Sequence, residues 1–535
     1  MKNFLILTVF VLSHSLCFAQ ENLQKVRITD FSGGMVSNSL ADLLQPNQSA
    51  SMLNVELSQP GKLKKRKGQS LFNRDVGSTA FKGIGRFDPD ANTSYLVAAS
   101  GVNIIRSLSS SVDWTIANPT SPLTTGLNTE FIQANDLLFV LNGYDNTSWY
   151  NGSNWIAGGS WPTSPPSATT GAWLRNYLFL AGATTENDWV YVSNNLAPTT
   201  FGATDIIKIN TGDGQKIQRL EAFRLNEVIA YKERSTFVLD ITGSPPSTCT
   251  TDCWTVQPIS TVIGTIAPRS VVNLGNDQWF LSSEPIAVRS LARTQFDKIL
   301  VNMVSAPIQD IFDGTGSYAI NKTYISKAAA VLFDNKYLLA IPVGTSSVNN
   351  LVAAYDFETN SWSLITGWYP EAWVTFDNKL YYIDANDGRV LECFANNYAD
   401  FAVGPNSASM PSVGIDLDYI SRNLDFDNTE NFKNLDSIEV EFDPTGTYEA
   451  VVYTNLDGRG WTSIGSVSLA ATSLTLPFTL PSPFGDAGLA RKTFPLSSKG
   501  DFKKLQVRVK QNAASEQTVF QRATIFASPR KWRRD

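Results

Sequence analysis

Histidine is almost absent from this chain of 535 residues. The single histidine, His14, lies within residues 1–19, which read as a secretory leader. A mature chain without this segment would have no histidine, which excludes Ser-His-Asp and Cys-His catalysis, imidazole-bound metals and histidine-based pH switching. A pair of carboxylates is the catalytic option that remains, and no motif points to one. We therefore predict that the protein is not an enzyme and has no catalytic residues.

Cysteine is scarce as well, with four in the chain, of which Cys17 lies in the leader-like segment. Cys249 and Cys253 frame the sequence Thr-Thr-Asp in a segment that looks like a loop. A disulfide across this loop would suit an exported protein and would leave Cys393 unpaired. Three cysteines without a nearby histidine cannot complete an ordinary zinc tetrahedron, so we expect no metal and no cofactor.

Charged residues make up only 17% of the chain, and the net charge is −6. At the level of composition, this modest negative charge gives no reason to expect tight binding to nucleic-acid phosphates. One basic cluster stands out between Gly61 and Gly68, where residues 62–67 carry five positive charges. A cluster of this kind is usually a solvated turn, and contact with DNA is the alternative.

Long apolar runs are also missing. Phe4–Leu12 forms the apolar part of the leader-like segment, after Lys2 and before a small-residue cleavage site at Cys17–Ala19. This run is too short for a membrane-spanning helix, which needs about 20 residues, and no later run approaches that length. A wrongly chosen start codon and an apolar N-terminal arm are the alternatives to a leader. We expect no membrane span in the mature chain.

Aromatic residues are plentiful, with 30 Phe, 17 Tyr and 13 Trp among many polar turn formers, a composition typical of many short strands. The tetrapeptide Phe-Asp-Asn-Lys occurs at 333–336 and again at 376–379, 43 residues later, which is about the length of one propeller blade. An asparagine that opens an apolar strand recurs along the chain, at Asn92, Asn135, Asn176, Asn226, Asn276, Asn335 and Asn378. We predict an all-β fold built on a β-propeller of about seven blade-like units.

The pattern divides the chain into five parts. Residues 1–19 are the leader-like segment, and residues 20–80 form an N-terminal arm with one short helix after Pro46. The propeller occupies 81–400, with a second short helix expected within 305–326, and 401–414 is a polar linker. Alternating apolar and polar residues, as in Ser437–Phe442, predict half-exposed antiparallel strands. Residues 415–535 are therefore expected to form a β-sandwich or jelly roll.

Several short segments resemble tail nozzle or tail-hub proteins of tailed bacteriophages, the family of tail tubular protein B. The matching segments run from about residue 28 to about residue 530, and each is short. They are Asp30–Gly34, Leu43–Gln48, Leu53–Val55, Lys64–Gly68, Ile266–Asn273, Val288–Arg293, Ser361–Trp362 and Leu489–Phe494. The resemblance singles out residues with structural roles, namely Phe31, Gly33, Gly34, Pro268, Arg269, Asn276, Arg289, Arg293 and Trp362. We expect Arg269, Arg289 and Arg293 to pin loops through hydrogen bonds to carbonyls and carboxylates.

The resemblance implies a structural virion protein that assembles in the host cytoplasm. Copies of the chain would form a ring, with six as the expected number, around the channel through which the genome leaves. Other tail or adaptor proteins and tail fibres would be its partners. DNA would pass through the lumen without sequence-specific binding, and a modestly acidic wall would let it slide.

The leader departs from this family, because a virion protein has no use for export. A functional leader would instead indicate an exported or periplasmic β-propeller that binds glycans or surface proteins. Its stacking surface would come from aromatic side chains such as Trp155, Trp161 and Trp373. A propeller glycoside hydrolase is the third hypothesis. Ring assembly would favour the virion protein, leader cleavage and a disulfide the exported protein, and clustered axial carboxylates the hydrolase.

Overall fold

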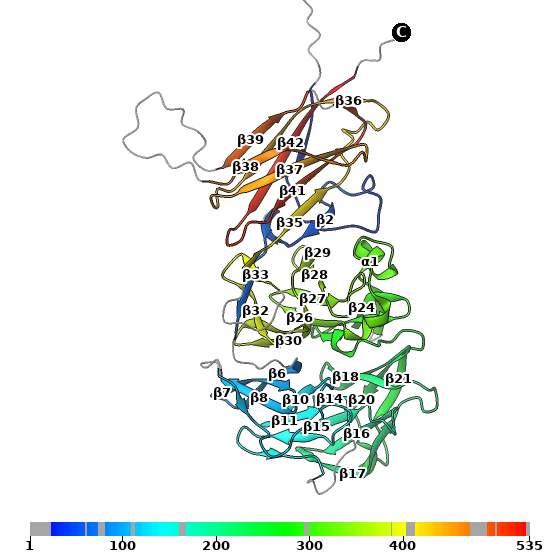
Figure 1. Ribbon diagram of the computed structural model, residues 1–535. Helices are drawn as coiled ribbons and strands as arrows, with labels where there is room; N and C mark the ends of the chain where they lie inside the picture. Colours follow the sequence, from blue (N-terminus) through cyan, green and yellow to red (C-terminus); the bar gives the residue numbers. More distant parts are fainter. Residues whose placement is uncertain are drawn as a thin grey trace, which may run out of the picture.

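The computed structural model describes residues 23–58, 61–72, 81–108, 113–159, 167–293, 299–386, 388–402, 412–470, 489–497 and 500–530. Strands dominate these residues, and the predicted all-β fold with a β-propeller is confirmed. The leader-like segment lies outside the described residues. Figure 1 shows the blades of the propeller around a common centre, with a second region of strands beyond one side of the ring.

Six blades are separate sheets of four antiparallel strands, and in five of them each strand pairs with the next along the chain. The first blade consists of β6 (Phe81–Asp90), β7 (Thr93–Ser100), β8 (Asn103–Leu108) and β9 (Thr115–Ile116). The second consists of β10 (Glu130–Ala134), β11 (Leu137–Leu141), β12 (Ser148–Tyr150) and β13 (Trp155–Ile156). The third consists of β14 (Thr170–Leu174), β15 (Tyr177–Ala181), β16 (Trp189–Asn194) and β17 (Ala197–Lys208). The fourth consists of β18 (Ile217–Phe223), β19 (Glu227–Lys232), β20 (Thr236–Asp240) and β21 (Thr255–Ser260). The fifth consists of β22 (Val272–Asn273), β23 (Gln278–Ser283), β24 (Ile286–Arg293) and β25 (Ile299–Met303). The sixth joins β30 (Pro370–Phe376), β31 (Lys379–Asp384) and β32 (Val390–Ala395) to β5 (Gly68–Leu71).

The blade count is therefore six, and the prediction of about seven blades is corrected. The difference comes from a further four-stranded set, β26 (Ala329–Phe333), β27 (Lys336–Ile341), β28 (Leu351–Asp356) and β29 (Ser361–Thr366), which is not a separate sheet. Its outer strand β29 pairs with an arm strand, and the set thereby becomes part of a nine-stranded sheet. Its first strand, β26, still lies in the ring of inner strands between β22 and β30.

The N-terminal arm closes the ring. Arm strand β5 pairs antiparallel with β32, for example Leu71 opposite Leu391, so the last blade takes its outer strand from the start of the chain. On the inner side, β30 of this blade lies beside β6 of the first blade. Closure by a distant part of the chain leaves the ring without a break at which a blade could open.

Asparagine shapes the turns between the blade strands. Asn135, Asn176, Asn335 and Asn378 have positive φ angles between 55° and 66°, and each lies one or two residues before an apolar strand. Asparagine tolerates this left-handed backbone better than most residues, which is the physical basis of the repeat in the sequence. The strands that follow, such as β15, are largely buried because neighbouring blades cover both of their faces.

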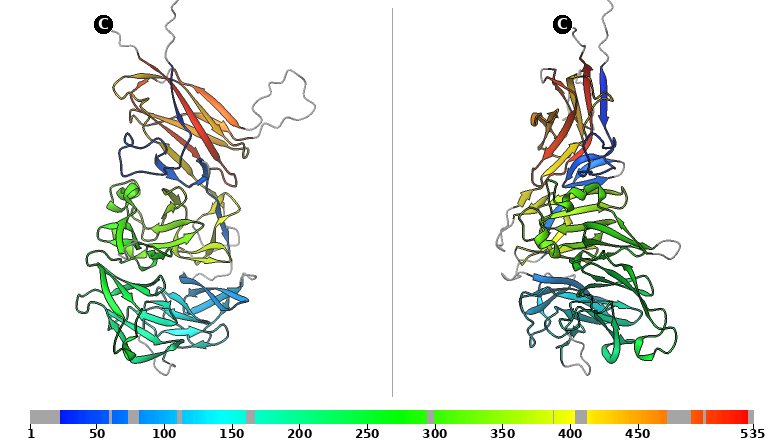
Figure 2. Two further views of the ribbon diagram at one scale, coloured as in Figure 1. Left: turned by 180° about the vertical axis from the view of Figure 1, so that it is seen from behind. Right: turned by 90° about the vertical axis from the view of Figure 1, so that its right-hand side faces the viewer.

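Two sheets make up the region beyond the propeller. One contains β1 (Gln24–Ile28), β3 (Val55–Ser58), β4 (Lys62–Lys65), β36 (Lys433–Phe442), β39 (Ala490–Pro495), β40 (Asp501–Phe502) and β42 (Val519–Pro529). The other is the continuation of the nine-stranded sheet through β2 (Ser49–Leu53), β35 (Leu417–Ser421), β41 (Leu505–Gln511), β37 (Glu449–Leu456) and β38 (Trp461–Ser468). Side chains of both sheets share one core with the β26–β29 set. Both views in Figure 2 show this region on one side of the ring. A separate C-terminal sandwich therefore stays a prediction, because these strands share a sheet and a core with the propeller.

The helix predicted after Pro46 is wrong, because Ser49–Leu53 is strand β2. Its backbone pairs antiparallel with β35 and, at Leu53, parallel with β29 at Leu364. These long-range partners override the weak local signal of a proline followed by helix formers.

The helix expected within 305–326 is confirmed as α1 (Gln309–Asp313), flanked by the 3-10 turns η3 (Ala306–Ile308) and η4 (Lys322–Lys327). The remaining short elements are η1 (Pro246–Thr248), η2 (Pro268–Ser270), β33 (Ala399–Phe401) and β34 (Ser412–Gly414).

Arg66 joins the arm to the propeller at what we call the junction, formed by Asn54, Arg66, Thr366, Trp368 and Asp400. The Arg66 side chain is fully buried and uses all five of its N–H donors. Nε donates to Asn54 Oδ1 at 2.9 Å, Nη1 donates to Asp400 Oδ1 and to the Lys67 carbonyl, and Nη2 donates to the Thr366 carbonyl and to Asp400 Oδ2. The guanidinium also lies over the Trp368 ring, 4.7 Å from its centroid. Trp368 Nε1 in turn donates to Asp400 Oδ1.

The basic cluster is therefore only in part the solvated group that the sequence favours: residues 62–65 form strand β4, Lys67 is exposed, and two of the five basic side chains are buried. Lys65 and Arg66 are buried, and Lys65 Nζ donates to Gln511 Oε1 at 2.8 Å and to the Ala513 carbonyl at 2.6 Å. Burial and then the nearby Arg66 lower the pKa of Lys65 from 10.5 to about 8. The cluster is a structural link between the arm and both other parts of the molecule, and these two basic side chains are not available to DNA.

Candidate functional site

The clearest hollow in the described part of the molecule lies at the centre of the propeller. We call it the axial cavity, and its volume is about 620 Å³. Its wall comes from one end of the inner strands, where each strand begins. The wall residues used below are Lys82, Asn128, Glu130, Phe131, Lys216, Gln218, Arg219, Pro268, Arg269, Lys327, Glu371 and Trp373. Because many blades contribute to it, the cavity exists only when the ring is closed.

Arg269 connects three blades at the wall. It follows Pro268 in the 3-10 turn η2 just before β22, and its guanidinium donates to the backbone carbonyls of Lys82, Thr129 and Glu371. Its Nη1 also lies 3.8 Å from Glu371 Oε1, and Lys82 Nζ lies 3.6 Å from the same oxygen. Pro268 and Arg269 were singled out by the sequence, and both lie at this cavity. The fixed fork of donors on arginine suits a side chain that holds several loops at once.

Arg219 makes a second structural contact across the wall. It lies in β18, pairs with Glu130 at the start of β10, and pairs with Glu221 of its own strand at 2.7 Å. Burial raises the pKa of Glu130, and the charge of Arg219 opposes that shift. A raised carboxyl pKa is compatible with a general acid. However, Glu130 is held by Arg219 and Glu371 by Lys82 and Arg269, so neither carboxylate is free of a basic partner.

Three polar side chains of the wall have no partner among the described residues. Lys216, just before β18, makes no ion pair there, and the side-chain amides of Gln218 and Asn128 make no hydrogen bond there. Lys216 is half-buried, and burial lowers its pKa. Taking an ammonium group partly out of water without a partner costs free energy, so such a group is a candidate for ligand binding.

The charges of the wall are unbalanced. Five basic residues line the cavity, namely Lys82, Lys216, Arg219, Arg269 and Lys327, against the two carboxylates of Glu130 and Glu371. Two half-buried aromatic side chains, Phe131 and Trp373, lie between these polar groups, and Trp373 Nε1 donates to the Ala329 carbonyl. A cavity of this size with aromatic and positively charged walls can hold a small anionic molecule.

The other residues that the sequence singled out meet elsewhere. Phe31 packs edge-on against Tyr419, with ring centroids 5.2 Å apart. Gly34 has a φ of +63° and lies so close to β29 that a Cβ would be 2.4 Å from Ser361 Cβ and 2.9 Å from the Trp362 carbonyl oxygen. Trp362 accepts from the Met35 amide through its carbonyl and donates from Nε1 to the Val304 carbonyl at 3.1 Å. At Gly33, a Cβ would lie 2.8 Å from Asn47 Cγ. Gly34 and Trp362 thus lie where the arm packs against β29, Gly33 packs within the arm, and Phe31 packs against β35.

Three predicted residues lie in the fifth blade. Asn276 is exposed in the turn between β22 and β23. Arg289 is buried in β24, and its Nε donates to Ser282 Oγ at 3.1 Å. Arg293 ends β24, and its side chain lies outside the described residues. Neither Asn276 nor Arg289 lines the axial cavity.

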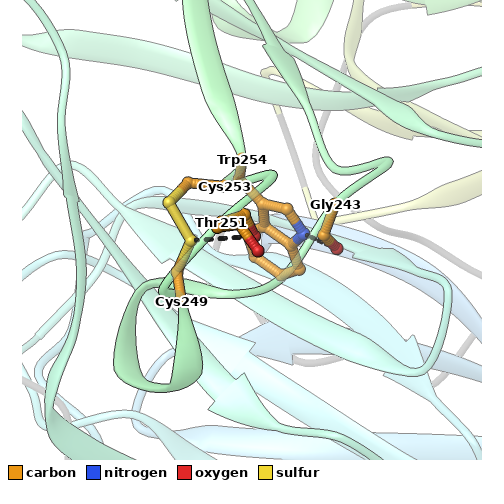
Figure 3. The surroundings of a disulfide bond; sticks show 5 residues. All are labelled: Gly243, Cys249, Thr251, Cys253 and Trp254. Carbon is orange, nitrogen blue, oxygen red and sulfur yellow. Dashed lines mark hydrogen bonds between the residues drawn. A yellow bond between two sulfur atoms is a disulfide. The ribbon is translucent and has the colours of Figure 1, made fainter.

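Cys249 and Cys253 form a disulfide, with their Cα atoms 5.4 Å apart. The loop that carries it connects β20 and β21 (Figure 3). Cys249 Sγ lies 3.7 Å from the Thr251 carbonyl oxygen, and Trp254 Nε1 donates to the Gly243 carbonyl at 2.9 Å. Cys393 is buried without a disulfide, and burial raises the pKa of its thiol. The disulfide loop follows β20, the third strand of its blade counted from the axis, whereas the axial wall is formed at the first, inner strands.

Sequence reasoning missed the wall residues Lys216, Gln218, Glu130 and Glu371. Each lies at the beginning of an inner strand or one residue before it, in a different context in each blade. The only available signal was a polar residue at the start of a strand that is otherwise apolar. That signal is common in β proteins, and only ring closure brings these positions together.

Among the described residues there is no group of His, Cys, Asp and Glu side chains that could hold a metal ion. No helix among them is long and apolar enough to cross a membrane.

No protein-family model matches the chain, and no curated protein matches it. Solved structures with a similar fold include YCF48 from Cyanidioschyzon merolae, at 16% identity and a TM-score of 0.40, covering 61% of this chain and 98% of that one. The WD40 domain of Pan2 from Neurospora crassa is 9% identical with a TM-score of 0.38, covering 62% of this chain and 95% of that one. BamB from Moraxella catarrhalis is 9% identical with a TM-score of 0.37, covering 62% and 97%. At these values the likeness concerns the fold and says nothing of function.

Proposed function

We propose that this chain is a non-enzymatic structural protein of a bacteriophage tail, a nozzle or hub subunit that assembles with its own copies into a ring. The observation that carries the proposal is the way the motif residues come together. Gly34 and Trp362, which resemble the tail family at distant places in the sequence, pack together where the arm meets β29, and Phe31 of the same arm motif packs against Tyr419 of the second region. A set of motifs that builds one contact supports a single common architecture.

The junction supports a mechanical role. Arg66 ties the arm to Thr366 and Asp400 through buried hydrogen bonds, and the arm also supplies β2 to one sheet and β5 to the last blade. The propeller and the second region are thus linked by shared sheets as well as by side chains. A subunit whose two parts share sheets and buried hydrogen bonds in this way suits an assembly that must hold its shape under load.

The axial cavity limits where a DNA channel could lie. A volume of about 620 Å³ suits a small molecule, whereas a DNA duplex has a major groove that is by itself about 12 Å wide. We therefore do not place the path of DNA along the axis of one propeller. In the proposed ring, the channel runs between copies of the chain, and the walls come from outer surfaces of the subunits.

The test is the assembly state of the full-length protein, purified without denaturation and measured by mass photometry and negative-stain imaging. Rings of a fixed number of copies, with six expected, and an uncleaved or internally started N-terminus would support the tail function. A chain that stays monomeric at micromolar concentration and begins at Gln20 would overturn it. N-terminal mass spectrometry of the same sample separates these outcomes.

An exported binding module is the second candidate, because the structure contains the Cys249–Cys253 disulfide. Disulfides persist mainly in oxidising compartments, whereas a virion protein forms in the reducing cytoplasm. Peptide mapping of the native protein with and without reduction tests this point. A disulfide present in nearly all molecules taken directly from the producing cells would favour export, and free thiols would favour cytoplasmic assembly.

A further inference from the structure

The axial cavity contains positive charge that the protein itself does not neutralise. Arg219 is paired with Glu130 and Glu221, while Lys82 and Arg269 share Glu371. These pairs account for every carboxylate of the wall. Lys216 has no ionic partner among the described residues, and Lys327 donates to the Ser347 carbonyl. Lys216 is therefore the ammonium group left for an anion that enters the cavity, and Lys327, which also lies over the Tyr324 ring, adds a second positive charge without a carboxylate partner.

Neutral polar groups and aromatic rings surround this charge. The side-chain amides of Gln218 and Asn128 make no hydrogen bond with the described residues. Each amide therefore offers a ligand two N–H donors and one carbonyl oxygen. Phe131 and Trp373 present half-buried rings to the same cavity. Amides beside aromatic rings suit a molecule that has hydroxyl groups at its edge and C–H groups on its faces.

We propose that the axial cavity binds an acidic sugar, a pyranose ring that carries a carboxylate. Lys216 holds the carboxylate, Gln218 and Asn128 bind hydroxyl groups, and Phe131 and Trp373 contact the faces of the ring. The volume of about 620 Å³ holds one or two such rings. This inference does not rest on the tail function, because the cavity is complete within one chain.

Other small anions fit less well. A phosphate group is usually bound by several backbone N–H groups or by a free arginine fork, and both arginines of this wall are already occupied by carboxylates and carbonyls. A nucleic-acid strand needs an open groove along its backbone rather than a cavity enclosed by blades. A carboxylate needs only one or two ammonium groups, and Lys216 and Lys327 are the basic residues of the wall that no carboxylate of the wall neutralises.

The experiment is isothermal titration of the full-length protein with D-glucuronate, with D-glucose and inorganic phosphate as comparison ligands. We expect saturable binding of glucuronate that is at least about tenfold tighter than binding of glucose, because a hydrogen-bonded charge adds roughly this factor. Binding of glucose equal to that of glucuronate would overturn the role of charge. Binding of phosphate without binding of glucuronate would overturn the sugar, and no binding of either at up to about 20 mM would overturn the site.

Variants connect the binding to the wall. Lys216→Met is expected to weaken glucuronate binding by about tenfold or more while leaving weak glucose binding unchanged, and Lys216→Arg is expected to restore most of the loss. Lys379→Met is the matched control, since Lys379 is an exposed lysine that pairs with Glu392 outside the cavity. Equal affinity in Lys216→Met and the wild type would contradict the proposal. Ring images recorded for each variant separate this result from failure of the proposed assembly.

Discussion

Arg66 at the junction and Lys216 in the axial cavity are both basic side chains that folding removes partly from water, yet their surroundings differ. Arg66 is completely buried, and every donor has an acceptor, including both oxygens of Asp400. Lys216 is half-buried and has no partner in the described part of the chain. Removing a buried charge that has a complete set of partners leaves those partners buried and unsatisfied, whereas a charge held without partners keeps its binding capacity for a ligand.

The same comparison applies to the residues that the sequence singled out, some of which lie at the arm and some at the axial cavity. The motif residues at the arm have contacts that explain them without a ligand, as Gly34 does through its positive φ and its approach to Ser361. Pro268 and Arg269 lie at the cavity, but Arg269 spends its donors on carbonyls of three neighbouring segments. The resemblance therefore selected structural residues, and the open binding capacity lies in residues that it did not select.

Removing the junction cation should have the largest effect. Arg66→Ala leaves the Asp400 carboxylate buried without its ionic partner, so we expect the free energy of unfolding to fall by about 3–5 kcal/mol. Urea denaturation followed by tryptophan fluorescence measures this change. Arg459→Ala removes an exposed ion pair with Asp457 and should cost no more than about 1 kcal/mol. Equal losses in the two variants would contradict the structural role of Arg66.

The buried Lys65 beside Arg66 gives a pH dependence. Its pKa falls from 10.5 in a solvated chain to about 8 in the fold, so between these values the unfolded chain binds more protons than the folded protein. Stability from this residue is therefore lowest below pH 8 and rises as the pH increases toward 10.5. Relative to Lys65→Met, the wild type should gain on the order of 2 kcal/mol between pH 8 and pH 10.

Urea denaturation of the wild type and of Lys65→Met at several pH values provides this measurement. Taking the difference between the two proteins removes the contribution of tyrosines that titrate in the same range. A difference that stays constant from pH 8 to pH 10 would mean that Lys65 keeps an ordinary pKa in the fold, and the buried environment assigned to it would be wrong.

The smallest effect on stability is expected at the cavity. Lys216→Met removes an ammonium group that has no protein partner, so the free energy of unfolding should change by no more than about 0.5 kcal/mol. The same denaturation experiment measures it, without ligand. A loss above about 2 kcal/mol would show that Lys216 has a structural role like that of Arg66, and the contrast between the two regions would disappear.

Several features of the fold were predictable because they depend on neighbours in the sequence. The asparagines at 135, 176, 335 and 378 mark turns with a left-handed backbone, and this local requirement made the blade repeat visible. The helix expected after Pro46 failed because Ser49–Leu53 finds its partners in β35 and β29, hundreds of residues away. The basic cluster failed in the same way, since its buried partners Gln511 and Asp400 are equally distant.

The sequence by itself determined an all-β chain with repeated propeller units, no histidine outside its first residues and a modest negative charge. These properties follow from composition and from turn chemistry, which act over a few residues. Only the tertiary structure decided that six blades are separate sheets and that β26–β29 continue into the second region. It also decided that Lys216 lines the axial cavity without a partner among the described residues, while every donor of Arg66 has an acceptor. The physical reason is that the burial and pairing of charges depend on which distant strands lie side by side, and closure of the ring fixes all of these neighbours together.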